Sequence, residues 1–229
     1  MKIIRILLFM VAVAAFASCG TSDQFTRGNQ YSQLYEEKPL SIVIMPPINQ
    51  TGAVEAKDYF YTTLYMPLCE KGYYVFSPQL TMDLFKQESA YDAELYVDGD
   101  LSKFREVLGA DAAMFTIIKS WDRNNFGGAI RTDVVYWLRS TKTGETLFKR
   151  EGQITLNTNF NVQGGGVIGA LVGVIATAVK TAATDVIVVG RKCSSYMLND
   201  LPAGKYDAAH FGKDKNMPAG KPLVSRVLQ

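Results

Sequence analysis

The first eighteen residues decide where the fold of this chain can begin. The sequence opens MKIIRILLFMVAVAAFASCG, in which Lys2 and Arg5 precede an unbroken apolar run from residue 6 to residue 17. A basic start, an apolar run and small residues at the end are the layout of a secretory signal peptide. The run is shorter than the ~20 residues that a transmembrane helix needs. We therefore expect residues 1–18 to be removed as a signal peptide.

Cys19 follows directly after the small residues Ala17 and Ser18. This ending resembles a bacterial lipobox, in which the cysteine becomes the acylated first residue of the mature chain, although Phe16 stands where that signal usually has Leu. The alternative is an ordinary signal peptide followed by an incidental cysteine. The sequence thus predicts lipidation of Cys19, with palmitate among the acyl chains, and attachment to a membrane without a spanning helix.

The part of the chain after residue 18 carries no net charge. Lys2 and Arg5 account for the excess, so that 22 of the 24 basic residues remain against 22 acidic residues. A neutral surface gives no electrostatic reason to expect nucleic-acid binding. With 48% hydrophobic residues, the chain is able to build one domain with extensions.

The hydrophobic pattern predicts an α/β domain over residues 39–202. Two strand–helix units, a third helix, three strands and a last helix are expected, over residues 40–45, 54–70, 73–76, 77–88, 101–109, 110–123, 129–141, 145–156 and 183–200. The first two strands should pair in parallel through crossover helices, whereas the last three are joined by short turns and should form an antiparallel meander. The expected fold class is therefore α/β, a mixed β-sheet with helices packed on one face.

The two flanks of the domain are expected to be irregular. Residues 19–38 are polar, with no helical or strand period, and are interpreted as a lipidated tether from which Phe25, Tyr31 and Tyr35 could dock on the domain or on a partner. Residues 203–229 contain several Gly and Pro residues and are interpreted as an irregular C-terminal tail.

A Gly-rich segment over residues 164–182 has glycines at 165, 169 and 173. Steps of four residues advance 400° around a helix, so these positions would line one slowly winding stripe. Its uncharged part, residues 167–179, would span only ~20 Å as a helix, less than the ~30 Å of a hydrocarbon core. We expect a close-contact helix in which Gly165, Gly169 and Gly173 approach another backbone. That contact could lie within the chain or between chains.

The residues that usually carry catalysis or bind metals are scarce. The only histidine, His210, lies in the expected tail, which is a poor place for a preorganised base. The acidic stretch DAELYVDGD lacks the spacing of a calcium loop, and QGGGVIG lacks the Gly-Lys-Ser/Thr ending of a phosphate loop. We therefore expect no catalytic residues, no metal and no cofactor.

Two further cysteines, Cys69 and Cys193, leave two alternatives open. An oxidising compartment permits a disulfide between them. Two buried thiols are the simpler interpretation, since free cysteine behaves as a small hydrophobic residue.

Four stretches taken together resemble a known family. They are PPINQTG (46–52), PLCEKGYYVFSP (67–78), LGADAAMFTIIKSW (108–121) and LPAGKYDAAHFGKD (201–214). With the lipobox, they are similar to bacterial outer-membrane lipoproteins of unknown function, of the meningococcal vaccine-antigen type. The resemblance implies a fold like the N-terminal domain of the periplasmic protein TolB. It also implies a gene that lies beside one for a lipoprotein similar to the curli-secretion channel.

The resemblance implies a non-catalytic accessory or assembly module of an outer-membrane lipoprotein or secretion complex, facing the periplasm. Its partners would be the curli-secretion-channel-like lipoprotein and further copies of this chain. The motif residues Pro46, Pro47, Asn49, Tyr73 and Tyr74 could form an interaction surface with the Gly-rich segment, or else serve as turn and packing residues. Two other functions remain open: a membrane-active or pore-forming oligomer built on residues 164–182, and a cell-wall or lipid hydrolase, which the scarcity of histidine disfavours.

Overall fold

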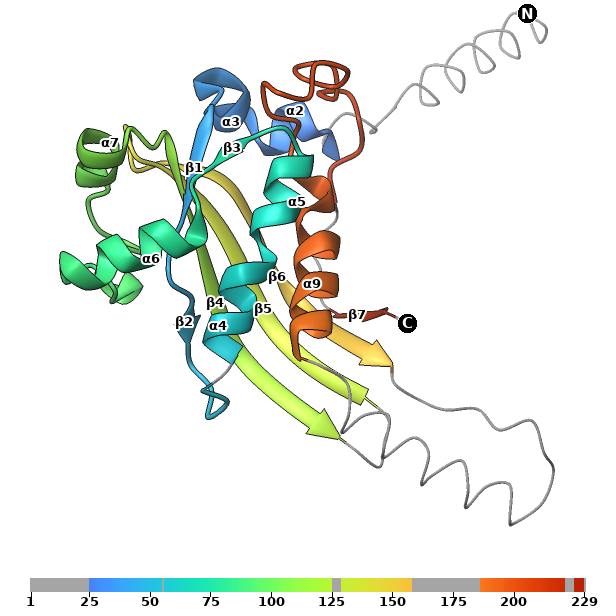
Figure 1. Cartoon of the computed structure of the whole chain (residues 1–229). Coiled ribbons are helices and arrows are strands. Elements are labelled where there is room, and N and C mark those ends of the chain that lie inside the picture. Colours follow the sequence, from blue (N-terminus) through green and yellow to red (C-terminus); the bar gives the residue numbers. More distant parts are fainter. Residues whose placement is uncertain (1–24, 55, 125–128, 158–185, 221–224, 229) are drawn as a thin grey trace, which may run out of the picture.

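A seven-stranded mixed sheet forms the centre of the molecule (Figure 1). The computed structural model describes residues 25–54, 56–124, 129–157, 186–220 and 225–228. The strands are β1 (Ser41–Ile44), β2 (Ile48–Asn49), β3 (Tyr74–Val75), β4 (Ala112–Asn124), β5 (Ala129–Ser140), β6 (Thr146–Asn157) and β7 (Ser225–Leu228). Their order is β3-β1-β4-β5-β6-β7, and β2 pairs with β4 beyond the end of β1.

The pairing of the strands confirms the predicted topology. β1 is parallel to both β3 and β4, with Ile42 opposite Val75 on one side and opposite Ala112 on the other. β4, β5 and β6 form the expected antiparallel meander, and each of its two pairings contains one register shift. The mixed α/β fold class is therefore confirmed.

Helices cover both faces of the sheet rather than one. The helices are α2 (Arg27–Gln30), α3 (Ser32–Glu37), α4 (Ala56–Thr63), α5 (Tyr65–Glu70), α6 (Pro78–Gln87), α7 (Ser102–Leu108) and α9 (Val186–Met197), with short 3-10 turns η2 (Ala93–Leu95) and η3 (Leu198–Asp200). Successive residues of β1 belong to different cores: Ile42 and Ile44 pack with α4 and α9, whereas Val43 and Met45 pack with α6 and α7. The prediction of helices on one face is wrong, because a fully buried strand requires cover on both sides.

The helix expected over residues 54–70 is divided into α4 and α5 at Leu64. Pro67 lies in the first turn of α5, where its missing N–H costs no helical hydrogen bond. Leu64 itself is fully buried in the larger core. The division therefore follows from the proline, which begins a new helix instead of kinking one.

The segment expected to be a tether is folded from residue 25 onward. Tyr31, Leu34 and Tyr35 share one face of the α2–α3 pair at helical spacing, and all three are buried in the core around α4 and α9. Phe25, by contrast, is 52% exposed. The tether predicted over residues 19–38 is thus too long, because a face of only three apolar residues has no recognisable period in the sequence.

The C-terminal tail is also more ordered than expected. Residues 203–220 run through successive turns, and β7 then adds to the sheet in parallel with β6. Before the tail, α9 places Val189, Cys193 and Met197 in the core at the predicted spacing. The irregular tail predicted over residues 203–229 therefore requires correction for β7, whose outward-facing residues gave no strand pattern.

Within the described ranges, no helix combines the length and the apolar character needed to cross a membrane.

Candidate functional site

The first described residues meet the turns of the tail at one end of the molecule, where Figure 1 shows α2. The backbone N–H groups of Arg27 and Gly28 donate to the carbonyls of Met217 and Lys215, each at 2.9 Å. The N–H of Ala219 returns to the carbonyl of Phe25. A short antiparallel contact therefore fixes the start of the fold to its last turns, and we call this region the terminal clasp (residues 25–37 and 199–220).

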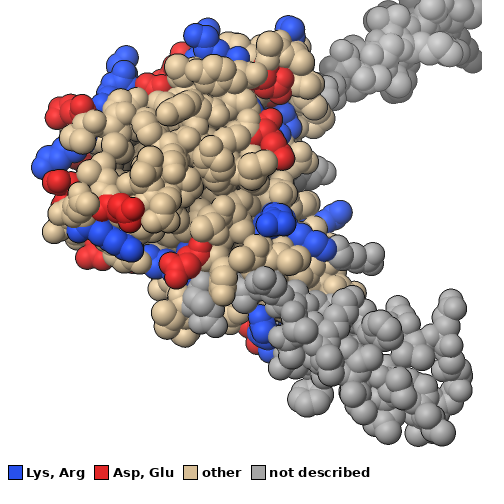
Figure 2. All heavy atoms as spheres, in the orientation of Figure 1, with Lys and Arg blue, Asp and Glu red and all other residues tan. Residues whose placement is uncertain are grey.

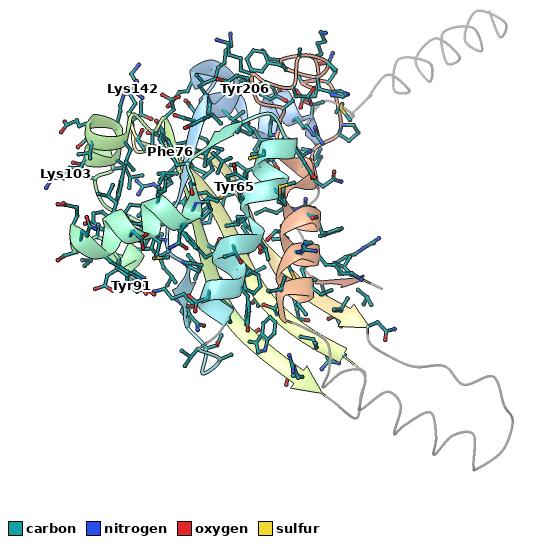
Figure 3. All side chains as sticks on the ribbon, in the orientation of Figure 1. Tyr65, Phe76, Tyr91, Lys103, Lys142 and Tyr206 are labelled. Carbon is teal, nitrogen blue, oxygen red and sulfur yellow. The ribbon has the colours of Figure 1, made fainter. Side chains whose placement is uncertain are left out.

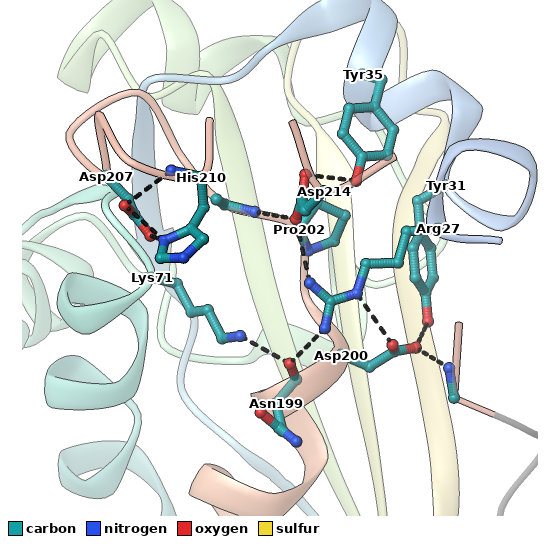
Figure 4. A network of polar contacts seen from close by, with 12 residues as sticks. Arg27, Tyr31, Tyr35, Lys71, Asn199, Asp200, Pro202, Asp207, His210 and Asp214 are labelled. Atoms are coloured by element: carbon teal, nitrogen blue, oxygen red, sulfur yellow. Dashed lines mark hydrogen bonds and ion pairs between the residues drawn. The ribbon is translucent and has the colours of Figure 1, made fainter. Parts of the chain in front are cut away.

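Arg27 lies at the centre of the clasp, between two buried carboxylates (Figure 4). Its Nη1 donates to Asp214 Oδ2 at 3.1 Å, and its Nη2 donates to the carbonyl of Asn199 at 3.1 Å. Its Nε is 3.4 Å from Asp200 Oδ1, an ion pair without the geometry of a hydrogen bond. Because the side chains of Arg27, Asp200 and Asp214 are 12%, 6% and 2% exposed, removing one charge would leave the others unpaired away from water.

Two tyrosines from the N-terminal helices complete the coordination of these carboxylates. The hydroxyl of Tyr31 donates to Asp200, and that of Tyr35 donates to Asp214 Oδ1 at 2.8 Å. Burial first, and the hydrogen bond to the carboxylate second, raise the pKa of both tyrosines well above the usual value. Both therefore remain protonated donors over the physiological range.

Backbone donors from the tail add further hydrogen bonds to the two carboxylates. The N–H of Gly220 donates to Asp200 at 2.7 Å, and that of Ala203 donates to Asp214 at 3.0 Å. Each carboxylate thus receives a tyrosine, a backbone amide and the guanidinium. This full set of partners explains why two acids can be buried in the clasp.

Two of the four stretches that carry the family resemblance meet beside the clasp. The N–H of Gly204 donates to the carbonyl of Lys71 at 2.7 Å, and the N–H of Tyr206 donates to that of Gly72 at 2.9 Å. The hydroxyl of Tyr73 donates to the carbonyl of Pro202 at 2.8 Å. The two backbones are so close that a Cβ on Gly204 would lie 2.4 Å from the carbonyl oxygen of Gly72. These motif residues therefore join α5 to the tail.

A polar cavity of about 380 Å³ opens between α5, α9 and the tail. Its lining includes Lys71, Ser195, Asp207 and His210. His210 Nδ1 is 2.9 Å from Asp207 Oδ2, and Lys71 Nζ donates to the carbonyl of Asn199 at 2.7 Å. Burial is the main cause that lowers the pKa of Lys71.

The chemistry available in this cavity is limited. An Asp–His pair orients an imidazole, but a nucleophile must then lie within hydrogen-bond reach of the other ring nitrogen. The ring of His210 has hydrogen bonds only to Asp207 within the described structure, and the side chain is 68% exposed. The cavity has the character of a surface recess between charged groups.

The five motif residues proposed as an interaction surface lie in different environments. Pro46, Pro47 and Tyr73 are buried, so that the predicted surface is corrected at these three positions. Asn49 makes a local turn, in which its Oδ1 accepts from the N–H and hydroxyl of Thr51. Tyr74 is 52% exposed on the edge strand β3 and is the one member of the five that presents its side chain to solvent.

Asp111 lies in the stretch LGADAAMFTIIKSW (108–121) and shows how a motif residue can be needed for the fold without taking part in catalysis. Its Oδ2 accepts from the backbone N–H groups of Leu40 and Ser41 at 3.0 and 3.1 Å and from the Ser41 hydroxyl at 3.1 Å. Its Oδ1 pairs with Arg105 at 3.2 Å. Asp111 therefore fixes the start of β1 against the start of β4, a structural role.

The remaining predicted sites are either unpaired or outside the described structure. Cys69 and Cys193 are free thiols, so that no disulfide joins them, and burial raises the pKa of Cys193 to about 12. The described residues contain no group of three His, Cys, Asp or Glu side chains that could hold a metal. The lipidation site Cys19 and the stripe glycines Gly165, Gly169 and Gly173 lie outside the described residues.

Sequence reasoning missed the charged centre of the clasp. Arg27 and Asp200 stand in stretches without any motif, and their partners are up to 187 positions away. Tyr31 and Tyr35 were the available signal, since two aromatic side chains in a polar segment suggest docking. The tail motif LPAGKYDAAHFGKD, which contains Asp214, was the other signal.

A family model and a sequence relative point to the same group of lipoproteins. The matching family model is described as "Putative lipoprotein GNA1162-like" and covers residues 29–203. Lipoprotein NMB1124/NMB1162 of Neisseria meningitidis serogroup B is 24% identical over 182 residues, 79% of this chain and 83% of that protein. The crystal structure of lipoprotein GNA1162 from Neisseria meningitidis has a TM-score of 0.48 at 22% identity and covers 62% of this chain and 98% of its own. A PelC dodecamer from Paraburkholderia phytofirmans has a TM-score of 0.42 at 10% identity, covering 70% and 87%.

Proposed function

Because this chain belongs to the GNA1162-like family of lipoproteins, we propose that it is a non-catalytic accessory module of the cell envelope. In this proposal an acylated Cys19 anchors it in the outer membrane, facing the periplasm. Its task is to hold a folded domain beside a partner lipoprotein during assembly or secretion. The terminal clasp is the observation that carries the proposal, because it ties helix α2, which begins eight residues after Cys19, to the rest of the domain.

The contacts of the clasp support a role in holding the domain beside a partner rather than a role in catalysis. Arg27, which lies eight residues after Cys19, is held by two buried carboxylates and a carbonyl. Such a network ties α2 to the last turns of the domain, as a scaffold that keeps one shape requires. In the cavity beside it, no described hydroxyl or thiol side chain is hydrogen-bonded to the ring of His210, which supports the same conclusion.

The edge of the sheet at β3 is the best-supported partner surface. Tyr74 is 52% exposed and its ring stands 5.2 Å from that of Phe76, edge to face. Tyr65 and Met66 on the neighbouring helix α5 are 36% and 60% exposed. Tyr, Phe and Met are enriched where proteins meet, and an edge strand has unpaired backbone groups to offer. We assign the partner lipoprotein, of the curli-secretion-channel type, to this β3 edge.

Affinity capture from envelope extracts tests the proposal. The full chain is expressed at its native level with a C-terminal tag in cells fed an alkyne-bearing fatty acid, so that captured lipoproteins can be recognised by their label. We expect a labelled partner of different mass with the wild type. Substituting Tyr74→Ser should reduce its recovery at least tenfold, since a central interface tyrosine contributes about 2 kcal/mol or more.

The matched control is Leu95→Ser, which changes an apolar side chain that is 70% exposed away from the β3 edge. This variant should recover the partner as the wild type does. Recovery of this chain alone, with no second labelled lipoprotein, would count against the accessory role. If Tyr74→Ser and Leu95→Ser reduce the recovery of the partner equally, the partner does not bind at the β3 edge.

A further inference from the structure

The length of chain before the clasp restricts how far the domain can stand from a lipid anchor. A tether over residues 19–38 would reach roughly 65 Å when extended, at ~3.5 Å per residue. The described structure starts at Phe25, and the six residue steps from Cys19 to Phe25 reach at most about 20 Å. The end of the molecule that carries Phe25 therefore has to lie close to any bilayer that holds Cys19.

That end of the molecule exposes apolar and basic side chains together. Phe25, Tyr206 and Met217 are 52%, 63% and 47% exposed, and Figure 3 places Tyr206 at the tip of the tail turns. Three lysines of the same turns, Lys205, Lys213 and Lys215, are also exposed. We call these six residues the anchor-side patch.

The lysines of the patch are not neutralised by nearby acids. None of the three forms an ion pair among the described residues. The two acids of the same turns are already engaged, since Asp214 is buried against Arg27 and Asp207 pairs with His210. Figure 2 shows Lys and Arg at the upper edge of the molecule with only scattered acidic groups among them.

The patch is held in shape before anything binds to it. Lys215 lies with its Nζ 5.3 Å from the centre of the Tyr35 ring, and its carbonyl accepts from Gly28. The hydrogen bonds of Gly204 and Tyr206 to the end of α5 fix the other side of the turns. Binding would therefore cost little ordering of the chain.

We propose that the anchor-side patch binds anionic phospholipid headgroups and serves as a second membrane signal beside the acyl group. Stable anchoring commonly combines acyl chains with basic groups, and lysines near an anionic surface each contribute to binding. Phe25, Tyr206 and Met217 enter the interfacial region while the lysines contact phosphates. The placement of the patch rests on the proposed acylation of Cys19, but its affinity for lipid does not.

Vesicle flotation tests this proposal without the acyl group. The mature chain, residues 19–229 with Cys19→Ser, is mixed with vesicles of phosphatidylcholine alone or with 30% phosphatidylglycerol added, about the anionic fraction of a bacterial bilayer. We expect binding to the anionic vesicles only, weakening as salt is raised. Replacing Lys205, Lys213 and Lys215 together by Gln should weaken it about 100-fold, or about fivefold for each lysine.

The control replaces Lys57, Lys86 and Lys103 by Gln, which removes the same charge from helices α4, α6 and α7. It should bind vesicles as the wild type does, and circular dichroism should show both triple variants folded. Equal weakening by both variants, or no preference of the wild type for anionic vesicles, would overturn the proposal. If the patch variant instead loses the labelled partner in affinity capture while vesicle binding is unchanged, the patch is a protein interface. Failure of flotation leaves the capture experiment at the β3 edge unaffected, so the two proposals fail separately.

Discussion

Removing the guanidinium of Arg27 should show how much the clasp contributes to the free energy of unfolding. Arg27→Met keeps a long apolar stem but deletes the cation that lies 3.1 Å from Asp214 and 3.4 Å from Asp200. Breaking a buried ion pair by removing one partner costs about 3–5 kcal/mol, because the remaining charge stays buried. Each carboxylate keeps a tyrosine and a backbone amide as donors, so we expect the lower end, about 3 kcal/mol.

Urea unfolding followed by tryptophan fluorescence measures this loss, since Trp121 and Trp137 lie in the central strands β4 and β5. Hydrogen exchange should show that residues 26–38 open more readily than in the wild type, because Arg27 ties α2 to Asp200 and Asp214. The control Arg105→Met breaks the pair with Asp111, whose side chains are 45% and 30% exposed, and should cost at most about 1 kcal/mol. If Arg27→Met costs no more than Arg105→Met, the clasp is not a stabilising network and the reasoning is refuted.

Two further predictions concern packing and pH. Gly204→Ala places a Cβ 2.4 Å from the carbonyl oxygen of Gly72 and should lower the free energy of unfolding by about 2–3 kcal/mol. The control Gly52→Ala adds a Cβ that meets nothing within 4 Å and should change the free energy of unfolding by about 0.5 kcal/mol or less. Thermal melts of the two variants compare them directly. Burial raises the pKa of Cys193 and of Tyr61 to about 12, from 9.0 and 10.0. The unfolded chain therefore loses these protons first, and the stability they contribute is complete below pH 9 and lost as the pH rises to about 12. Urea midpoints at pH 8 and pH 11 should show this decline, and a smaller decline in Cys193→Ala; an equal decline in both proteins would assign it to other groups.

The strands at the centre of the sheet could be predicted because the hydrophobic pattern that defines each of them lies within the strand itself. β4, β5 and β6 carry their own hydrophobic pattern and are joined by short turns, so each could be placed within a few residues. The run Leu40–Met45 also held the evidence that both faces of the sheet are covered. A continuous apolar strand is buried on both sides, and alternation would have indicated one covered face.

The clasp could not be predicted in the same way. Its interactions join positions 169 to 187 residues apart, and no local pattern records such partners. Asp200 and Asp214 look like ordinary surface acids in the sequence, and only the folded chain shows that Arg27 lies between them. The same reasoning applies to β7, a short strand with exposed side chains that is defined by its pairing with β6.

The contact between the two ends of the chain sets an order of events in biogenesis. Tyr31, Leu34 and Tyr35 stay uncovered until Asp200, Asp214 and the turns after them have been delivered, so a chain exported from its N-terminus cannot close this end early. Over that interval Arg27 also lacks both of its carboxylate partners, so the end of the domain that is made first is the last to be completed.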